Sequence, residues 1–507
     1  MSQTIHAVKD VIGIAGTGLM GRGIAQIAVQ AGIFVVLYDN RPGASEDAKE
    51  AIVAMLEKLA AKGKLTADAV AQAADRLVAA EAISELSPCT LVVEAIVEDL
   101  EVKQALFREL EGVVSESCIL ATNTSSLSVT AIAAACQRPS RVGGFHFFSP
   151  VPLMKIVEVI AGPLTDSSVV DRLVELASNM GHTPVRASDT PGFIVNHAGR
   201  GYLTESLRLF GERVASHTEI DKILRLAGGF RMGPFELLDL TGLDVSQPVM
   251  ESIYDQYYQE PRFRPSPIAR QRLAAGLLGR KTQRGFYNYV EGQKESFSEA
   301  LVPQAEMLPV WISRSDRKTF PNVVALLKKL GAELDTGMIP LEDSLCLLLT
   351  VGEDVTTVAA KAMLDPIRCV GLDPIFLGGC RTLMTNPVTG SRYRDSAYAM
   401  FAADGTPVTV IHDSPGFVAQ RVIATIVNIG SDIAQQGIAT PQDIDHAVTL
   451  GLGYPLGPLS MGDKYGAKTI MRILDGLFEF YRDPRYRPSP WLKRRALLEV
   501  SLLTPEN

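Results

Sequence analysis

The sequence has few of the features that mark secreted, zinc-binding or membrane-spanning proteins. Its six cysteines are scattered over 507 residues, and none forms a Cys-x-x-Cys pair or clusters with the seven histidines. This pattern predicts free thiols in a reducing compartment and no metal site. No apolar run is long enough to cross a bilayer, and residues 1–6 lack the charged start of a secretion signal. We therefore expect a cytoplasmic protein with no membrane partner.

An excess of positive charge is also missing. The formal net charge is −8 at pH 7, which argues against generic binding to nucleic acid and leaves a local basic patch open. Hydrophobic residues make up 47% of the chain and charged residues 21%, as in ordinary globular proteins. A chain of 507 residues is too long for one core, so we expect three or four domains.

A glycine-rich turn near the start of the chain has the setting of a dinucleotide-binding loop. A short apolar strand, residues 11–15, runs into Gly-x-Gly-x-x-Gly, and a helix over residues 22–30 is expected to follow. The glycines of the motif are Gly16, Gly18 and Gly21. They let the backbone turn tightly and approach a pyrophosphate at the helix N-terminus, where free N–H groups attract anions. In this context the motif predicts a dinucleotide site.

An acidic residue after the second predicted strand, residues 34–38, bears on the choice of dinucleotide. Asp39 is placed to accept hydrogen bonds from the adenosine ribose hydroxyls, and its charge would repel a 2′-phosphate. Arg41, two residues on, is instead suited to hold such a phosphate. NAD is the prediction, and NADP is the alternative.

Residues 45–80 are expected to form a pair of helices that carries several lysines. Lys58 and Lys62 are four residues apart, so they share one helix face. Such lysines form either a solvated face or a clamp for a phosphate-rich substrate tail, and both interpretations are open.

Polar side chains cluster where two further apolar segments end. Residues 91–96 form a predicted strand, with Glu98 just beyond it. Residues 118–121 form another, and Asn123 and Ser125 follow directly. Ligands bind at such strand ends in a parallel sheet, but Ser and Asn also cap helices. For Asn123 and Ser125, cap and binding site are both open.

The segment from residue 143 to residue 159 pairs a histidine with a carboxylate. His146 lies at a predicted strand end, and Glu158 lies in the next apolar strand, on the face opposite Val157 and Val159. A carboxylate there is costly to desolvate unless it is paired, and His146 is the expected partner. A carboxylate bonded to one ring nitrogen fixes the tautomer and raises the basicity of the other. These residues alone fit a catalytic pair or a structural ion pair.

The C-terminal part of the chain repeats the helical segment that follows residue 189. Four positions recur at a constant offset of 224 residues (413 − 189). The recurring pairs are Asp189 and Asp413, Asp221 and Asp445, Gly233 and Gly457, and Asp239 and Asp463. Agreement at a constant offset predicts a duplicated domain.

The second copy lacks the polar groups of the first. Gln420 stands where the first copy has Asn196, and residues 301–410 alternate strands and helices without a glycine-rich fingerprint. Matching residues 385–388 to residues 148–151 places Leu383 at the position of His146. We therefore expect the second half to be structural and to bind no second cofactor.

Together these patterns predict an α/β fold in four parts. An N-terminal Rossmann-type domain is followed by an all-α domain, a degenerate α/β segment and a second copy of the α domain. The expected boundaries are 1–189 for the NAD-binding domain, 190–291 for the helical domain, 292–410 for the degenerate segment and 411–507 for the second helical copy.

Over about residues 8–290 the chain resembles the 3-hydroxyacyl-CoA dehydrogenase family. The family pattern runs Asn-Thr-Ser-Ser-Leu, His-Phe-Phe-x-Pro, Met-Lys-x-Val-Glu-Val and Pro-Gly-Phe-x-x-Asn, and all four segments occur here in order. The long form with a degenerate second half is similar to the bacterial enzymes of phenylacetate breakdown, which act on 3-hydroxyadipyl-CoA. A short-chain 3-hydroxybutyryl-CoA dehydrogenase of β-oxidation is the alternative.

The resemblance implies a role for each matching residue. His146 takes the 3-hydroxyl proton as hydride passes to the nicotinamide, Glu158 orients it, and Ser125 and Asn196 hold the reacting oxygen. NAD is the implied cofactor. The implied NAD contacts are Gly16, Gly18, Gly21, Asp39, Glu98, Lys103, Asn123 and Lys281.

The chain departs from the family pattern at several positions. Ser149 replaces the usual Asn of His-Phe-Phe-Asn-Pro, and Gln283 replaces a common Gly. On the substrate-facing helix, only Lys62 matches a CoA contact of the family, and Met55 and Glu50 do not match. Arg200 follows Asn196 by four residues, so both face the same way. It is either a partner for the far carboxylate of an adipyl chain or an ordinary surface arginine.

Two other functions stay open at this level. One is a different Rossmann dehydrogenase with a catalytic Lys or Cys, and the other is a non-catalytic scaffold like the lens crystallins related to the family. The retained set of Ser125, His146, Glu158 and Asn196 argues against a scaffold. The expected partner is an acyl-CoA substrate. The second helical copy is expected to pack on the first as a built-in partner, and a homo-oligomer stays open.

Overall fold

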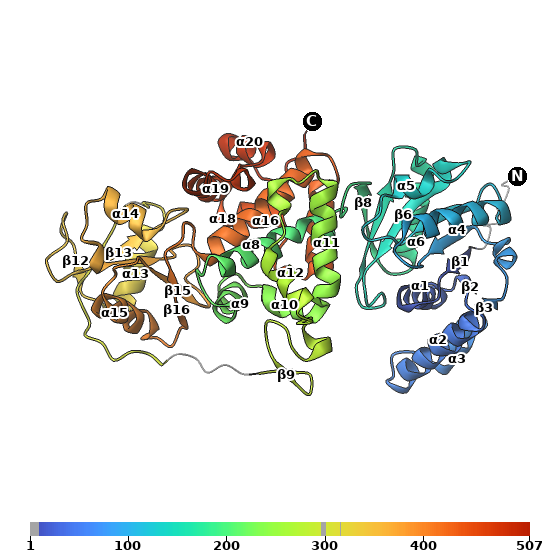
Figure 1. Ribbon diagram of the computed structural model, residues 1–507, viewed down its shortest axis with the longest axis horizontal. Coiled ribbons are helices and arrows are strands. Elements are labelled where there is room, and N and C mark those ends of the chain that lie inside the picture. The colour runs from blue at the N-terminus through green and yellow to red at the C-terminus, as the bar shows by residue number, and fades with distance from the viewer. Residues whose placement is uncertain (1–9, 296–300, 315, 507) are drawn as a thin grey trace, which may run out of the picture. The chain divides into compact units, whose positions relative to one another are not determined.

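The computed structural model describes residues 10–295, 301–314 and 316–506, which fold into two compact units (Figure 1). The first unit comprises Met1–His197 and Gly437–Leu452, and the second comprises Ala198–Gln436 and Gly453–Asn507. Both units contain a sheet flanked by helices, which confirms the predicted α/β class. Each helix in the described part of the chain is too short or too polar to cross a membrane.

The first unit is built on an eight-stranded sheet with the order β3-β2-β1-β4-β5-β6-β7-β8. The strands are β1 (Val11–Ala15), β2 (Phe34–Tyr38), β3 (Leu77–Ala80), β4 (Leu91–Glu94), β5 (Ile119–Thr122), β6 (Val142–Phe147), β7 (Ile156–Ala161) and β8 (Thr183–Ser188). Neighbours run parallel except for the antiparallel pair β6 and β7. The central strands are apolar on both faces because helices cover both faces of such a sheet.

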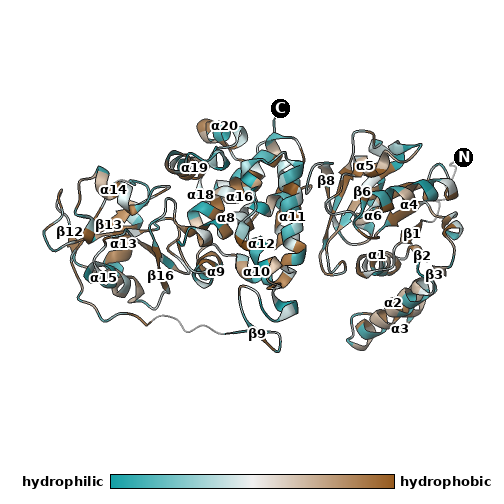
Figure 2. Cartoon of the chain, in the orientation of Figure 1, coloured by the Kyte–Doolittle hydropathy of each residue, from teal (hydrophilic) through white to brown (hydrophobic). Residues whose placement is uncertain are grey.

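Helices on the two faces of this sheet bury separate apolar clusters. The helices are α1 (Leu19–Gln30), α2 (Ala44–Ala61), α3 (Ala67–Ala74), α4 (Leu100–Val113), α5 (Val129–Ala133) and α6 (Ser167–Asn179). Val93 of β4 packs in the cluster that holds Ile24 of α1, whereas its neighbour Val92 packs in the cluster that holds Phe107 of α4. This alternation is the period of two that a strand imposes. The helices in Figure 2 accordingly carry apolar and polar residues on different sides.

The predicted strands at residues 11–15 and 34–38 are confirmed with the same bounds. The predicted helical pair at residues 45–80 is wrong at its end, because residues 77–80 form β3 and pair with β2. The segment Leu-Val-Ala-Ala is short and rich in alanine, so its local sequence favours a helix as much as a strand. Pairing with β2 decides the matter, since strand preference depends on the neighbouring chain.

The second unit joins the first helical copy, a second sheet and most of the second helical copy. The first copy contains α8 (Arg200–Gly211), α9 (His217–Leu226), α10 (Pro234–Thr241), α11 (Leu243–Gln256) and α12 (Pro267–Ala274). The second copy contributes α16 (Val418–Gln435), α18 (Pro458–Tyr465), α19 (Ala467–Tyr481) and α20 (Pro490–Leu498). Its α17 (Pro441–Leu452) belongs to the first unit and packs on β7 and β8. The predicted domain boundaries stay predictions.

The second sheet has six strands in the order β12-β11-β13-β14-β15-β16. The strands are β11 (Val310–Ile312), β12 (Leu334–Asp335), β13 (Leu345–Leu349), β14 (Cys369–Leu372), β15 (Arg381–Thr385) and β16 (Val408–His412). Its helices are α13 (Phe320–Lys329), α14 (Val355–Lys361) and α15 (Ser391–Ala402). As in the first sheet, one antiparallel pair, β14 and β15, interrupts parallel pairing.

The helical domain is duplicated in backbone conformation as well as in sequence. Gly192 and Phe193 have φ angles of +76° and +47°, and their counterparts Gly416 and Phe417 have +77° and +46°. A positive φ is uncommon for phenylalanine, so its recurrence at the same offset is a specific sign of duplication. Asp189 accepts the N–H groups that begin α5, and Asp413 accepts those that begin α14.

The sheet register corrects the predicted counterpart of His146. In the first sheet His146 lies opposite Glu158, and in the second sheet the same position of the antiparallel pair holds Asp373 opposite Thr382. The prediction that Leu383 replaces His146 is therefore wrong. It failed because residues 385–388 lie at the end of β15, whereas the counterpart of β6 is β14.

Contacts made by the two helical copies are reciprocal. The N–H of Ser188, on β8, donates to the carbonyl of Ile438 at 2.8 Å, and the N–H of His412, on β16, donates to that of Val214 at 2.9 Å. The two bonds are related by the repeat offset, since 412 − 188 and 438 − 214 both equal 224. Such exchange of equivalent partners is what a two-fold interface produces.

Helices α8 and α16 form the centre of the packing between the copies and lie side by side in Figure 1. A Cβ added at Gly201 of α8 would lie 3.2 Å from the backbone of Ile426, so the helices approach closely because this residue is glycine. Arg421 of α16 is fully buried and donates to Glu205 of α8 at 2.7 Å.

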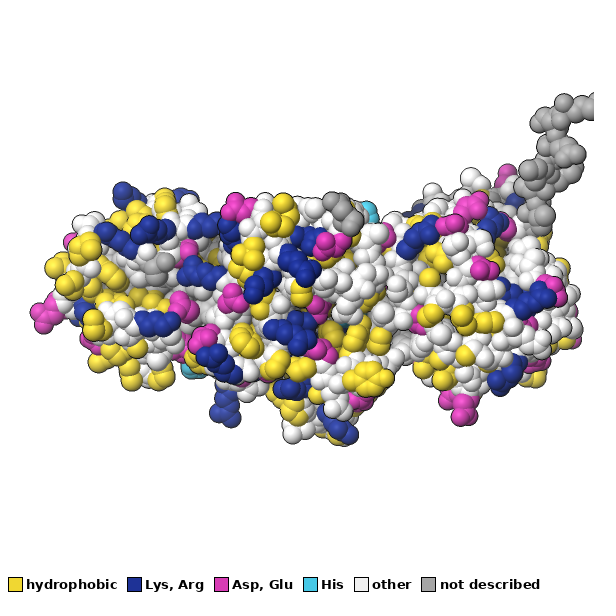
Figure 3. All heavy atoms as spheres, turned by 90° about the horizontal axis from the view of Figure 1, so that it is seen from above, with side chains coloured by type: hydrophobic (Ala, Val, Ile, Leu, Met, Phe, Trp, Pro, Cys, Tyr) yellow, Lys and Arg dark blue, Asp and Glu magenta, His cyan; other side chains and the backbone are white. Residues whose placement is uncertain are grey.

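At the surface, Figure 3 shows positive and negative side chains interspersed.

Candidate active site

A cavity of about 710 Å³ opens beside the glycine-rich turn of the first unit. Gly16 has a φ of +100°, and a Cβ there would lie 2.6 Å from the carbonyl oxygen of Ala95. A Cβ at Gly21 would lie 1.9 Å from the carbonyl oxygen of Gly16, so the turn packs directly on α1. A Cβ at Gly18 would meet nothing within 4 Å, which leaves this backbone open to a ligand. These features fit a pyrophosphate at a helix N-terminus.

Asp39, at the end of β2, lines the same cavity. Its carboxylate accepts the N–H and hydroxyl of Thr17, both at 2.9 Å, and the Nε–H of Arg41 at 3.1 Å. Burial opposes the charge of Asp39, but the hydrogen bonds from Arg41 and Thr17 outweigh it and lower the pKa to about 2. Asp39 is therefore an anion at neutral pH and ties down the arginine that would hold a 2′-phosphate, an arrangement that suits NAD.

His146 and Glu158 lie directly opposite each other on the antiparallel strands β6 and β7. The Nδ1 atom of His146 is 2.7 Å from Oε2 of Glu158, and the carboxylate is fully buried. The other carboxylate oxygen accepts the N–H groups of Ile194 and Val195, both at 2.9 Å. Glu158 is therefore held by backbone as well as by the imidazole. The Nε2 atom of His146 makes no hydrogen bond within the described ranges.

A second buried carboxylate, Glu94 at the end of β4, was not predicted as a site residue. It accepts Nζ of Lys103 at 2.5 Å, the hydroxyl of Thr122 at 2.7 Å and the N–H of Ile96 at 2.8 Å. The sequence shows Glu94 within an apolar run, and nothing in that run indicates that three elements meet at its side chain. The carboxylate joins β4, α4 and β5.

Lys103 continues this network to the loop that carries Ser125. Its Nζ atom is 3.3 Å from Glu98, which accepts the N–H groups of Ser125 and Ser126 at 2.9 and 3.0 Å. Burial opposes the charge of Glu98, but Lys103 and these hydrogen bonds outweigh it and lower the pKa to about 2. Lys103 is itself 1% exposed. The predicted NAD contacts Glu98 and Lys103 therefore brace the loop in this structure.

Two asparagines join the loop to its neighbours. Asn123 accepts the N–H of Phe147 at 2.8 Å, which brings the ends of β5 and β6 together. Asn196 donates to the carbonyl oxygen of Ser125 at 3.4 Å. The structure thus gathers Asn123, Ser125, His146 and Asn196 around one edge of the sheet, where ligands bind in parallel α/β folds.

Comparison with known proteins assigns the family. Residues 11–190 match the NAD-binding domain of 3-hydroxyacyl-CoA dehydrogenase, and residues 192–289 and 416–500 match its C-terminal domain. The chain belongs to the 3-hydroxyacyl-CoA dehydrogenase family. Two matches to the C-terminal domain agree with the duplicated helical domain of this dehydrogenase.

Relatives of the dehydrogenase come in a long and a short form. It is 38% identical over 499 residues to the 3-hydroxyadipyl-CoA dehydrogenase of Escherichia coli (strain K12). This alignment covers 97% of this chain and 98% of the relative. It is 42% identical over 291 residues to the mitochondrial hydroxyacyl-coenzyme A dehydrogenase of Sus scrofa, covering 56% of this chain and 91% of the relative. The crystal structure of 3-hydroxybutyryl-CoA dehydrogenase from E. coli K12 is 36% identical and superposes with a TM-score of 0.85 over 97% of this chain and 98% of that one.

The dehydrogenase is therefore an NAD-dependent oxidoreductase that oxidises 3-hydroxyacyl-CoA. The predicted family, cofactor and activity are confirmed. The residues of the first unit fit NAD, since the turn at Gly18 is open and Asp39 is ionised beside the cavity. The family assignment replaces the two alternatives, a different Rossmann enzyme and a non-catalytic scaffold.

Three predicted contact residues lie outside this cluster. Lys62 is exposed where α2 ends, and Lys281, in the second unit, pairs with Asp244 at 2.5 Å. Arg200, at the start of α8, is 6% exposed, so the alternative of an ordinary surface arginine is wrong. Burial lowers the pKa of Arg200 to about 10, which leaves it a cation at neutral pH.

Two of the departures from the family pattern, Gln283 and Ser149, lie at unusual backbone positions. Gln283 has a φ of +57°, in the left-handed region that glycine adopts without strain, which accounts for the glycine common in the family. Ser149 precedes Pro150 through a cis peptide bond. Nothing in the structure explains the serine at that position.

Proposed function

We propose that His146 is the general base of this dehydrogenase and that Glu158 is its positioning residue. The hydrogen bond of 2.7 Å between Nδ1 and Glu158 is the observation that carries the proposal, because it leaves Nε2 to accept the proton of the 3-hydroxyl group. Two backbone N–H groups hold Glu158 in turn, so the imidazole has a fixed direction. A proton that arrives on Nε2 creates an imidazolium beside a buried carboxylate, which stabilises it.

Roles for the remaining site residues are proposed from their match to the family pattern. Ser125 and Asn196 orient the reacting oxygen, and their contact at 3.4 Å supports a shared role. NAD, when bound, would supply the acceptor for the hydride of C3 of the substrate. Glu98, Asn123 and Lys281 complete the contacts made by the glycine turn and Asp39, and Lys103 acts through Glu98. Lys62 is proposed to bind the phosphates of CoA.

Replacing the imidazole tests the central role. In His146→Gln, kcat for 3-hydroxybutyryl-CoA oxidation falls about 10²- to 10⁴-fold, the usual contribution of a general base. Binding of NAD, followed by protein fluorescence, stays within about twofold of wild type, because the glycine turn is untouched.

A matched control is His446→Gln, since His446 is an exposed histidine in the same unit. It is expected to keep wild-type kcat. A second variant, Glu158→Gln, is expected to lower kcat more than it changes KM, as a positioning role requires. Wild-type turnover in His146→Gln would refute the assignment.

We further propose that the preferred substrate is 3-hydroxyadipyl-CoA, with 3-hydroxybutyryl-CoA as the alternative. The names of the full-length relatives point to both. The buried guanidinium of Arg200, four residues after Asn196 in the chain, supports the longer substrate. A cation in desolvated surroundings binds a carboxylate strongly and with defined geometry.

Comparing two substrates tests this preference. Arg200→Met is expected to reduce kcat/KM for 3-hydroxyadipyl-CoA at least about 30-fold and that for 3-hydroxybutyryl-CoA less than about threefold, because one substrate carries the far carboxylate and the other does not. Arg270→Met removes a largely exposed arginine and is the control for lost charge. If Arg200→Met lowers kcat/KM equally for both substrates, Arg200 does not bind the far carboxylate. The shorter substrate, 3-hydroxybutyryl-CoA, would then be the better assignment.

Two finer proposals concern the molecule in the cell. A cytoplasmic location is supported by six cysteines that are all free, five of them buried, as in a reducing compartment. Pairing of the two helical copies within one chain is supported by the reciprocal contacts of Ser188 and His412. Both stand beside the catalytic proposal and do not depend on it.

A further inference from the structure

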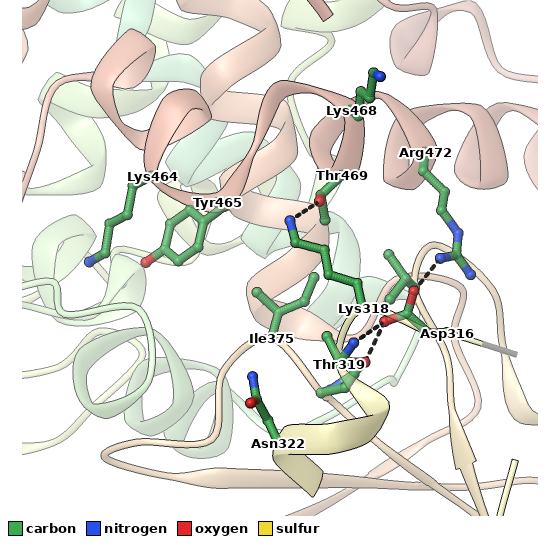
Figure 4. A pocket seen from close by; sticks show the side chains of 12 residues that line it. Asp316, Lys318, Thr319, Asn322, Ile375, Lys464, Tyr465, Lys468, Thr469 and Arg472 are labelled. Carbon is green, nitrogen blue, oxygen red and sulfur yellow. Dashed lines mark hydrogen bonds and ion pairs between the residues drawn. The ribbon is translucent and has the colours of Figure 1, made fainter. Parts of the chain in front are cut away.

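A cavity of about 470 Å³ lies in the second unit, at the carboxyl ends of β11, β13 and β14 (Figure 4). Its walls are the start of α13 on one side and residues of α18 and α19 on the other. The volume falls in the range of roughly 300–1,000 Å³ typical of small-molecule sites. The place corresponds to the sheet edge where α/β folds bind ligands. None of the residues that line it belongs to the catalytic cluster of the first unit.

The cavity carries an excess of positive charge. Four cations line it, namely Lys318, Lys464, Lys468 and Arg472, against one carboxylate, Asp316. Arg472 pairs with Asp316 at 2.7 Å, and Lys468 pairs with Glu499. In the described residues, neither Lys318 nor Lys464 has a carboxylate at ion-pair distance. Two uncompensated lysines on opposite walls are therefore available to an anion.

Hydroxyl and amide groups accompany these lysines. In Figure 4, Lys318 reaches from the α13 side toward Thr469 of α19, and its Nζ atom is 3.3 Å from that hydroxyl. Tyr465 and Asn322 also line the cavity. A hydroxyl contact of this length holds the lysine in place without neutralising it, so the charge stays directed at the cavity.

Two buried polar atoms beside the cavity have no partner. Within the described ranges, Oγ1 of Thr350 and Oδ2 of Asp373 are buried without a hydrogen bond, although both residues are 1% exposed or less. Each directly precedes a lining residue, Val351 and Pro374. Buried polar atoms are nearly always satisfied, so unsatisfied ones next to a cavity indicate room for water. Of the two, the hydroxyl of Thr350 can donate to a phosphate oxygen, whereas the carboxylate of Asp373 can only accept and is suited to a water or a donor group.

This site differs from the glycine turn of the first unit. Asp316 accepts the N–H of Thr319 at the start of α13, so its carboxylate takes the place that a phosphate has in a dinucleotide fold. Binding would instead use lysine side chains, which act as point charges toward phosphate. We propose that this cavity binds a phosphate-bearing small molecule through Lys318 and Lys464.

The test uses the full-length protein in saturating NAD, which fills the cleft of the first unit. Inorganic pyrophosphate is titrated by calorimetry, with adenosine diphosphate as a second probe. Wild type is expected to bind one equivalent of pyrophosphate, and Lys318→Ala/Lys464→Ala to bind it at least about tenfold more weakly. Tighter binding of adenosine diphosphate than of pyrophosphate would identify a nucleotide as the source of the phosphate.

Lys328→Ala/Lys329→Ala is the matched control, because it removes the same charge from exposed positions at the far end of α13. It is expected to bind pyrophosphate as wild type does. The single variant Lys464→Ala serves if the double variant fails to fold, since the ammonium group of Lys464 lies over the ring of its own neighbour Tyr465. No saturable binding to wild type, or equal weakening in both double variants, would overturn the proposal.

Discussion

At the residue scale, the two halves of the chain differ at the positions that carry the proposed chemistry. Asp373 stands in the place of His146, Thr382 in that of Glu158, and Gln420 in that of Asn196. Gln420 donates to Asp373 at 3.0 Å, so the second half keeps a buried polar contact at this position. A carboxylate held by an amide has neither the imidazole nor the orienting acid of the first half. The oxidation chemistry is therefore expected from the first half alone.

Asp373 makes the stability of the second half depend on pH. Burial raises the pKa of this carboxyl group to about 6, against an ordinary value near 4, although the hydrogen bond from Gln420 opposes the rise. The folded protein therefore binds a proton that the unfolded chain releases, and the free energy of unfolding falls as pH rises from about 4 to about 6. Asp373→Asn removes this titration. At pH 7.5 it is expected to be more stable than wild type by about 1–3 kcal/mol, measured by urea unfolding.

The same comparison at pH 4.5 separates charge from packing. There Asp373 is mostly protonated in the folded protein, so the advantage of Asp373→Asn should largely vanish. Asp255→Asn, at an exposed position of α11, is the control for loss of one carboxylate. A stability difference that is the same at both pH values would show that Asp373 does not titrate in this range.

Single residues also show where sequence-based prediction works and where it fails. His146 and Glu158 were predictable because the two strands are consecutive and strand alternation puts both side chains on one face. Glu94 was not predictable, because its three partners come from separate parts of the chain. The counterpart of His146 was wrongly assigned to Leu383, because a register between strands depends on pairing, which a short sequence match does not reveal.

At the element scale, the corner between β4, α4 and β5 depends on one buried ion pair. Glu94 and Lys103 are both 1% exposed or less, and the pair is joined to Glu98 and the loop of Ser125. A buried pair of charges contributes little net stability compared with an apolar pair, but removing one partner leaves an uncompensated charge. The pair therefore specifies how the three elements meet.

Removing one partner of the Glu94–Lys103 pair should lower the free energy of unfolding more than removing both partners. Glu94→Gln is expected to lower the free energy of unfolding by about 3–5 kcal/mol, because buried Lys103 loses its 2.5 Å partner and keeps only the longer contact with Glu98. Adding Lys103→Met should recover at least half of that loss, which urea unfolding of the single and double variants measures.

The outcome that would contradict this account is a double variant as unstable as the sum of its two single variants. In that case Glu94 and Lys103 would stabilise their elements independently. NAD binding is a second readout, since a displaced Ser125 loop is expected to weaken it in Glu94→Gln and to recover in the double variant.

At the scale of the whole molecule, the duplicated helical domain accounts for contacts that are reciprocal. Arg264 lies 3.7 Å from Asp483, and Arg487 lies 3.0 Å from Glu260, so equivalent residues exchange partners (487 − 264 and 483 − 260 both equal 223). Exposed pairs of this kind add little stability, but their symmetry shows how the copies face each other. The face of α8 that meets α16 is then already covered within one chain.

Because α16 covers α8 within one chain, a substitution in their interface should change the stability of the fold and leave the oligomeric state unchanged. Gly201→Leu forces a side chain into the 3.2 Å approach to α16 and is expected to destabilise the fold by about 1–3 kcal/mol. Because the interface lies within one chain, the unfolding midpoint should not depend on protein concentration, and light scattering should give the same mass for variant and wild type. Gly112→Leu, where a Cβ meets nothing within 4 Å, is the control. A wild-type dimer that dissociates in Gly201→Leu would mean that α8 pairs between chains.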